Sequence, residues 1–225
     1  MDEALLPADV LAAARDRRGG ATEVAARALD GLLEVAGDRG RLDAAVAVLL
    51  AGQPAMAPMW HLARAARAPD PAAALRQLRR LLATDAAAAV DTAAAWLAAR
   101  PGPVRTVSHS SLVDRVLARA GIAAEEESHG HGLAQVEAAT GVGLVGADAI
   151  GPDALLNATG TAALATLVPT LVVATGVKLV PAAVFARMAA PGFETVPLAA
   201  VAAVALGGEL IAPAEAGRRA AVLDR

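Results

Sequence analysis

Three side chains that could take part in chemistry follow short β-branched or apolar runs in the second half of this 225-residue chain. They are Ser108 after the run 104–107, Asp148 after the run 142–145, and Lys178 after the run 171–174. A carboxyl group can donate a proton and its carboxylate form can accept one, and an ammonium group attracts a negatively charged ligand. We therefore expect these positions to matter most if the three runs end side by side.

A polar turn lies between the last two runs. Its polar and small residues are Asn157, Thr159, Gly160 and Thr161. A helix is expected to begin near Thr161, and the free N–H groups and dipole of a helix start favour an anion. With Asp148 and Lys178, this turn would suit a phosphorylated polyol. A plainer alternative is that Asp148 caps a turn, Asn157 satisfies a loop and Lys178 is solvated.

The elements that would position these residues alternate between strand and helix. The three runs predict strands, and a helix is predicted from Ser110 or Ser111 to about Ala120, with Gly121 ending it. Another short helix is predicted over 133–139. Such alternation favours a parallel sheet with crossover helices, and these sheets bind ligands beyond the carboxyl ends of their strands.

The first hundred residues follow a different pattern. Apolar residues recur at spacings of three and four, which predicts helices, and abundant alanine agrees with this. The predicted helices cover 22–36, 42–50, 56–66, 72–82 and 85–99. The segment Arg100-Pro101-Gly102-Pro103 ends the pattern. We therefore predict an α/β protein with a helical domain at 1–100 and a parallel-sheet domain at 101–225.

Composition excludes several classes of function. The chain has no cysteine, only 2% aromatic residues and a net charge of −3, so thiol chemistry and direct nucleic-acid binding are not expected. The most apolar stretch, 161–177, is broken by Pro169 and Gly176 and is shorter than the roughly 20 residues that span a bilayer. Acidic residues stand where an export signal needs basic ones, so we expect a cytoplasmic protein without membrane association.

Histidines offer little evidence for a metal site. His129 and His131 lie in a glycine-containing polar stretch, and we interpret this stretch as a solvated loop rather than a metal site. His109 follows a predicted strand, but adjacent residues on a strand point to opposite faces, so it is poorly placed to pair with Ser108. We expect neither a metal nor an organic cofactor.

Several segments, in order along the chain, resemble one known family. The run Gly146-Ala147-Asp148-Ala149-Ile150, followed by Asn157-Ala158-Thr159-Gly160-Thr161 and a lysine, resembles the central signature of the translation initiation factor 2B alpha/beta/delta family. That family includes methylthioribose-1-phosphate isomerase and ribose-1,5-bisphosphate isomerase. Weaker similarities occur at 18–25, 53–59, 104–110 and 193–198.

The resemblance implies a helical N-terminal domain followed by a Rossmann-like domain through which two copies form a homodimer. It implies that Asp148 is a catalytic acid or base for aldose-to-ketose isomerisation of a sugar phosphate, with Ser108 at the position of its catalytic partner. The residues that it implies for substrate binding are Arg18, Gly20, Ala21, Gln53, Asn157, Thr159, Gly160, Thr161 and Lys178.

The sequence departs from the family at positions that matter for catalysis. Ser108 replaces a cysteine, and a hydroxyl group is a much weaker acid than a thiol. Ala158, Gln53 and Gly19 stand where the family has charged residues, although Arg18 is adjacent to the last of these. The interval 110–146 also looks short by one strand–helix unit. The chain is thus predicted to be a degenerate, shortened member.

Three functions remain open. The first is binding of a phosphorylated metabolite or nucleotide with little or no isomerase activity. The second is an active isomerase that uses Asp148 with a substitute partner such as Ser108, Ser110 or His109. The third is a structural or regulatory oligomerisation module.

Overall fold

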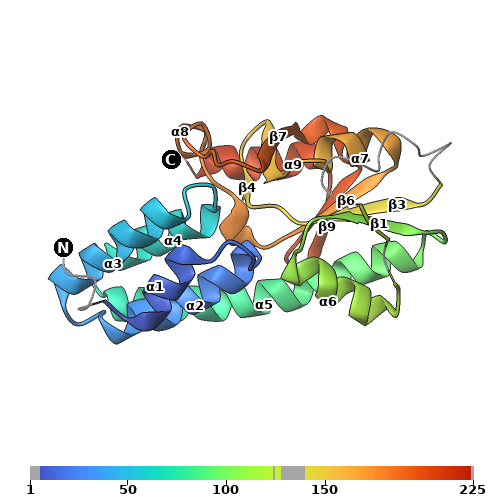
Figure 1. Cartoon of the computed structure of the whole chain (residues 1–225). Helices are drawn as coiled ribbons and strands as arrows, with labels where there is room; N and C mark the ends of the chain where they lie inside the picture. Colours follow the sequence, from blue (N-terminus) through green and yellow to red (C-terminus); the bar gives the residue numbers. More distant parts are fainter. Residues whose placement is uncertain (1–5, 124, 128–139, 224–225) are drawn as a thin grey trace.

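Helices occupy the first hundred residues of the computed structural model, which describes residues 6–123, 125–127 and 140–223 (Figure 1). They are α1 (Ala8–Arg15), α2 (Ala21–Glu34), α3 (Arg39–Gly52), α4 (Ala57–Ala66) and α5 (Pro71–Ala98). The helices predicted between residues 22 and 66 are confirmed. Helix α1 was missed; it is short, and Pro7 precedes it without a side-chain cap.

The two helices predicted over 72–82 and 85–99 are wrong as separate elements, because α5 is one helix of 28 residues. The Thr84 hydroxyl donates to the carbonyls of Arg80 and Leu81, both at 3.0 Å, so the polar pair at 84–85 fits inside the helix. Early residues such as Leu75 pack in the core of the helical part, and later ones such as Trp96 pack against the sheet.

By length and composition, α5 is the one helix in the described part of the chain that could cross a membrane. The core helix of a globular protein meets the same test. Eight of its residues are buried in the two cores that it joins.

A six-stranded sheet follows the helices, with strand order β2-β1-β3-β6-β8-β9. Its strands are β1 (Val104–Val107), β2 (Glu125–Glu127), β3 (Val142–Val145), β6 (Thr170–Ala174), β8 (Ala203–Leu206) and β9 (Glu209–Ile211). The first five pair in parallel and β9 is antiparallel. The predicted Rossmann-like parallel sheet is confirmed, whereas β8 and β9 were not predicted.

Helices cover both faces of this sheet (Figure 1). Leu171 and Val173 of β6 pack with α5 and α6 (Ser111–Ala120), while Val172 packs on the opposite face with α7 (Thr161–Leu167) and α9 (Pro213–Val222). Burial on both faces explains why these strands are continuous apolar runs. Helix α6 ends as predicted, with Gly121 at a φ of 67°.

A second, antiparallel sheet was not predicted. It has three strands in the order β4-β5-β7, formed by β4 (Ala149–Ile150), β5 (Ala154–Ala158) and β7 (Phe193–Pro197). Asn157 therefore belongs to a strand rather than to the predicted turn, and it pairs in register with Glu194. Short elements η3 (Gly176–Lys178), η4 (Leu198–Ala200) and α8 (Ala182–Phe185) complete this region.

The interval after α6 differs from its prediction where it is described. Residues 125–127 form an edge strand rather than a loop, paired in parallel with β1. The helix predicted over 133–139, and both His129 and His131, lie outside the described residues.

Candidate functional site

The parallel strands place the candidate residues at the point where the sheet's connections diverge. Counting only parallel strands in chain order, the sheet reads 2-1-3-4-5, with the first strand, β1, between β2 and β3. In sheets of this kind ligands bind beyond the carboxyl ends of the two strands where the order reverses. Here those ends carry Ser108 after β1 and the segment 146–148 after β3.

A pocket of about 1270 Å³ opens at this point. Eight of the predicted site residues line it, and they are Arg18, Gly20, Ala21, Gln53, Ser108, Asp148, Asn157 and Lys178. Thr159, Gly160 and Thr161 do not line it. The fold therefore brings the loops that follow α1 and α3 together with residues of the sheet region at one cavity.

Asp148 is fixed through its backbone and leaves its carboxylate to the pocket. Its N–H donates to the Leu156 carbonyl at 2.9 Å, and its carbonyl accepts from the Ala57 N–H at 2.9 Å. The side chain makes no hydrogen bond within the described part of the chain. Burial raises the pKa of its carboxyl group, and the nearby Lys178 ammonium group opposes that rise.

Lys178 sits on the short turn η3, which residues from two helices hold at both ends. The Gly176 N–H donates to the Asp85 carboxylate of α5 at 3.1 Å. Nε2 of His61 on α4 lies 2.8 Å from the Leu179 carbonyl, at the distance of a hydrogen bond in which the ring nitrogen donates. Val177 packs in the core of the helical part. The helices thus fix the lysine that the sheet carries.

Lys178 is a buried residue whose amine reaches the pocket wall and makes no hydrogen bond within the described structure. The residue is 3% exposed, and its ammonium group makes no hydrogen bond to any described residue. Burial lowers its pKa from 10.5 to about 8, and the Asp148 charge opposes this change. The predicted alternative of a solvated lysine is therefore wrong. A buried cation of this kind is costly unless something pairs with it.

Ser108 adopts an uncommon backbone conformation, with a φ of 59°, and it is the one described non-glycine residue with positive φ. Such strain tends to concentrate at functional sites. The next residue, His109, turns away to Asp114 of α6, with Nδ1 3.3 Å from its carboxylate, and both side chains are exposed. His109 is therefore paired with α6 rather than with Ser108.

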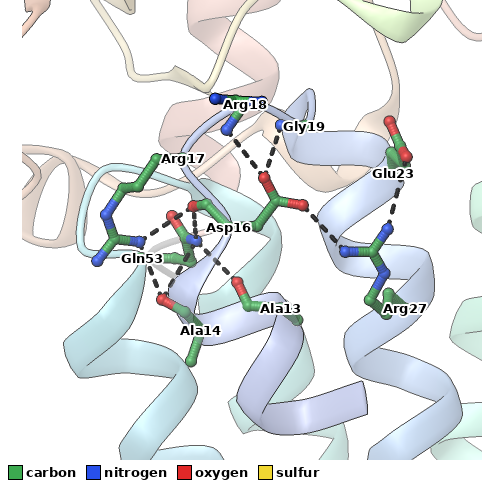
Figure 2. Close-up of polar contacts among 9 residues, drawn as sticks. All are labelled: Ala13, Ala14, Asp16, Arg17, Arg18, Gly19, Glu23, Arg27 and Gln53. Carbon is green, nitrogen blue, oxygen red and sulfur yellow. Dashed lines mark hydrogen bonds and ion pairs between the residues drawn. The ribbon is translucent and has the colours of Figure 1, made fainter. Parts of the chain in front are cut away.

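The helical wall of the pocket is built around Asp16, which the sequence reading did not single out (Figure 2). One carboxylate oxygen accepts from the N–H groups of Arg18 and Gly19 at 2.9 and 2.7 Å, and the other accepts from Arg27 at 3.0 Å. These backbone hydrogen bonds, and then the Arg27 charge, lower the pKa of Asp16. An aspartate before two glycines is the signal that predicts such a turn.

Gln53 holds this wall in place rather than extending its amide nitrogen into the pocket (Figure 2). The amide nitrogen donates to the carbonyls of Ala13 at 2.8 Å and Asp16 at 2.7 Å, and it lies 3.4 Å from that of Ala14. These carbonyls lie at the end of α1, where Arg17 Nη1 also donates to those of Ala14 and Asp16 at 2.9 and 3.0 Å. We predicted that Gln53 binds the substrate. In the structure, its amide nitrogen instead donates both hydrogens to backbone carbonyls.

The helix start at 160–162 is already occupied by an anion of the protein. A carboxylate oxygen of Glu194 on β7 accepts from the N–H groups of Gly160 and Ala162 at 2.9 and 2.8 Å. The prediction that these groups are free for a ligand is therefore wrong. Thr161 instead accepts a hydrogen bond from the Asn157 amide at 2.9 Å, which orients Asn157 at the pocket wall.

Comparisons with known proteins were made for sequence and for structure. No protein-family model matches the sequence, and no curated protein matches it either. Solved structures do match. Translation initiation factor eIF-2B from Pyrococcus horikoshii OT3 aligns with a TM-score of 0.76 and 18% identity, over 96% of this chain and 99% of that one. The chain has the fold of this initiation factor.

Two further structures share this fold. The tetrameric eIF2B-beta2-delta2 complex from C. thermophilum matches with a TM-score of 0.71 and 15% identity, over 96% of this chain and 92% of that chain. The 5-methylthioribose 1-phosphate isomerase of Pyrococcus horikoshii OT3 matches with a TM-score of 0.57 and 14% identity, over 96% and 87%. The fold implied by the sequence resemblance is thus confirmed, while the degenerate, shortened character of the chain stays a prediction.

Proposed function

We propose that the pocket binds a small phosphorylated metabolite or nucleotide. The observation that carries this proposal is a pair of ionisable side chains, the half-buried Asp148 and the buried Lys178, which line one cavity without hydrogen-bond partners among the described residues. Buried charges without partners are costly, and a ligand that hydrogen-bonds to both would remove much of that cost.

The electrostatics of the pocket mouth favour an anion. Arg17 and Arg18 both line it. The starts of α2 and α6 also meet there, since a Cβ atom built on Gly20 would lie 3.1 Å from the Ser111 nitrogen. Two helix N-termini and two guanidinium groups present donors and positive potential to a phosphate group.

Little or no isomerase activity is proposed for this pocket. The hydroxyl group of Ser108 has no base paired with it in the described structure, and His109 is directed toward Asp114. A proton-transfer partner of suitable acidity typically contributes about 10²–10⁴ in rate. Its loss would leave binding intact while removing most of the turnover.

Thermal unfolding in the presence of candidate ligands tests the binding proposal. D-ribose 5-phosphate, methylthioribose 1-phosphate and AMP would each be added at millimolar concentration, with D-ribose as the unphosphorylated comparison. A bound compound at ten times its Kd should raise Tm by about 3–5 °C. Arg18→Ala should reduce the shift, whereas Arg119→Ala, on the exposed surface of α6, should not. No shift with any phosphorylated compound would contradict the proposal.

A second candidate function is isomerisation that uses Asp148. The observation in its favour is the raised pKa of the Asp148 carboxyl group, which moves an acid toward the range useful for proton transfer. Ribose-1,5-bisphosphate and methylthioribose 1-phosphate are the substrates to assay. Turnover that Asp148→Asn abolishes would establish this function; no turnover would eliminate it for those two compounds.

We also propose that the chain is a cytoplasmic homo-oligomer, with a dimer formed through residues 101–225. Support comes from the fold shared with a subunit assembly described as tetrameric. Light scattering of the purified chain gives the test, and a monomer at micromolar concentration would contradict it.

A further inference from the structure

Lys178 is the single lysine in the chain. Lysine and arginine together number 20, and all of these except Lys178 are arginine. Surface ion pairs such as Arg119 with Asp91 and Arg219 with Glu209 use guanidinium groups throughout. The one amine on a side chain is placed in the wall of the pocket, where it is 3% exposed.

An amine and a guanidinium group differ in what they can do. Arginine stays protonated in every protein environment and serves as a fixed cation with planar donors. Lysine can lose its proton when it is buried, and its nitrogen then carries a free electron pair. A site that needed only positive charge would be served by the residue this chain uses everywhere else.

The surroundings of Lys178 increase the share of neutral amine. Its Nζ has no hydrogen-bond partner among the described residues, and Asp148 supplies the one charge that acts on it appreciably. Burial lowers its pKa to about 8, which makes the neutral fraction at pH 7.5 more than a hundred times that of a solvated lysine. Asp85 and His61 hold the turn that carries it, so the amine has a fixed position.

We propose that Lys178 is a nucleophile that forms an imine with an aldehyde or ketone bound in this pocket. Its neutral Nζ adds to the carbonyl carbon as the C=O π bond breaks, and a proton moves from the nitrogen to the oxygen to give a carbinolamine. The hydroxyl group of that intermediate takes a proton and leaves as water, and a C=N bond to Nζ remains. Asp148, on the same cavity, is the group placed to donate that proton. The phosphorylated nature of the ligand rests on the proposed function, while the reactivity of the amine does not.

Reductive trapping tests the proposal. Wild-type protein at pH 7.5 would be treated with glycolaldehyde and cyanoborohydride, and the modified peptides located by mass spectrometry. Lys178 in the native protein should react about a hundred times faster than the same residue in protein unfolded by urea. The amino group of the first residue gives an internal standard. A native rate no faster than the rate in urea would overturn the proposal.

Two variants assign the roles. Lys178→Arg should lose the pocket adduct and keep labelling at the first residue, because a guanidinium group does not form the imine under these conditions. With rates expressed per neutral amine, because the variant also lowers the Lys178 pKa, Asp148→Asn should slow trapping at Lys178 at least tenfold by removing the proton donor. Unchanged trapping in Asp148→Asn would overturn the role given to Asp148. If Lys178→Arg fails to fold, the native-to-urea ratio of the wild type still decides the proposal.

A second experiment distinguishes imine formation at Lys178 from the proposed binding of a phosphorylated ligand. D-ribose 5-phosphate would be used both for thermal stabilisation and for trapping. Stabilisation by the phosphorylated sugar without any adduct at Lys178 would leave the binding function standing and overturn the imine. Rapid trapping of glycolaldehyde, without stabilisation by any phosphorylated compound, would support the imine and contradict the phosphorylated ligand.

Discussion

The two walls of the pocket treat their polar groups in opposite ways. In the helical wall, Asp16 and Gln53 satisfy neighbouring backbone groups, and Arg27 pairs with Asp16. In the sheet wall, Lys178 is buried and Asp148 half-buried, and neither side chain makes a hydrogen bond within the described chain. The named polar side chains of the helical wall make hydrogen bonds within the chain. The two ionisable groups of the sheet wall make none and are available to a ligand.

This difference separates positioning residues from binding residues. A polar residue whose hydrogen bonds are all made within the chain contributes stability, and its removal should be felt in unfolding. A buried ionisable group without such bonds lowers stability, and it is retained where a ligand or a reaction requires it. The predictions below follow this contrast.

The largest expected effect is at Gln53. In Gln53→Leu, the carbonyls of Ala13 and Asp16 lose the hydrogen bonds from the Gln53 amide and keep only the Asp16 N–H at 3.4 Å and Arg17 Nη1 at 3.0 Å, which should lower the free energy of unfolding by about 2–3 kcal/mol. Urea denaturation measures this loss. Gln77→Leu, the same change on the exposed face of α5, is the matched control and should stay within about 0.5 kcal/mol. Equal effects at the two positions would remove the structural role given to Gln53.

The next effect is a rise in stability at alkaline pH. The pKa of Lys178 is about 8 in the folded chain and ordinarily 10.5, so the unfolded chain binds more protons between these values. Stability should therefore increase as pH rises from 8 to 10.5, by about 2 kcal/mol, and this contribution is lost as pH falls through 8. The chain has no cysteine or tyrosine to titrate in this window. Lys178→Met should abolish the rise, and a flat wild-type profile would contradict the burial of the amine.

The smallest of these effects concerns Glu194 on β7. Unlike Asp148, its carboxylate already accepts hydrogen bonds from the chain. Glu194→Ala should lower the free energy of unfolding by about 1–2 kcal/mol, because the N–H groups of Gly160 and Ala162 lose their acceptor. Glu194→Gln keeps an acceptor oxygen and should cost less than half as much. A larger loss in the glutamine variant than in the alanine variant would be inconsistent with capping.

The sequence predicted the parts of the fold that depend on local pattern. Short runs such as β3 were correctly predicted as strands because burial on both faces leaves no charged residue in them, and β1 was predicted from its valines although it also holds Arg105 and Thr106. The strands β4, β5 and β7 were missed because their partners are distant: Asn157 pairs with Glu194, and no local signal marks that register.

The candidate site was predictable by position and less so by role. The rule that ligands lie beyond parallel strand ends correctly placed Ser108, Asp148 and Lys178 at one cavity. The structural duty of Gln53 depends on where α1 ends, and the capping by Glu194 depends on a strand pairing across about 35 residues of sequence. Neither contact has a sequence signature, so tertiary packing decided both.

One measurement tests the central claim, that Lys178 is a buried residue on the same pocket as Asp148 whose amine makes no hydrogen bond within the described chain. Because the chain has one lysine, protein labelled with ¹³C-lysine gives one side-chain signal by NMR, and its pH titration reports one pKa. The account predicts a midpoint of about 8 in the wild type and a lower one in Asp148→Asn, since the Asp148 charge raises this pKa. A midpoint near 10.5 in the wild type would contradict it.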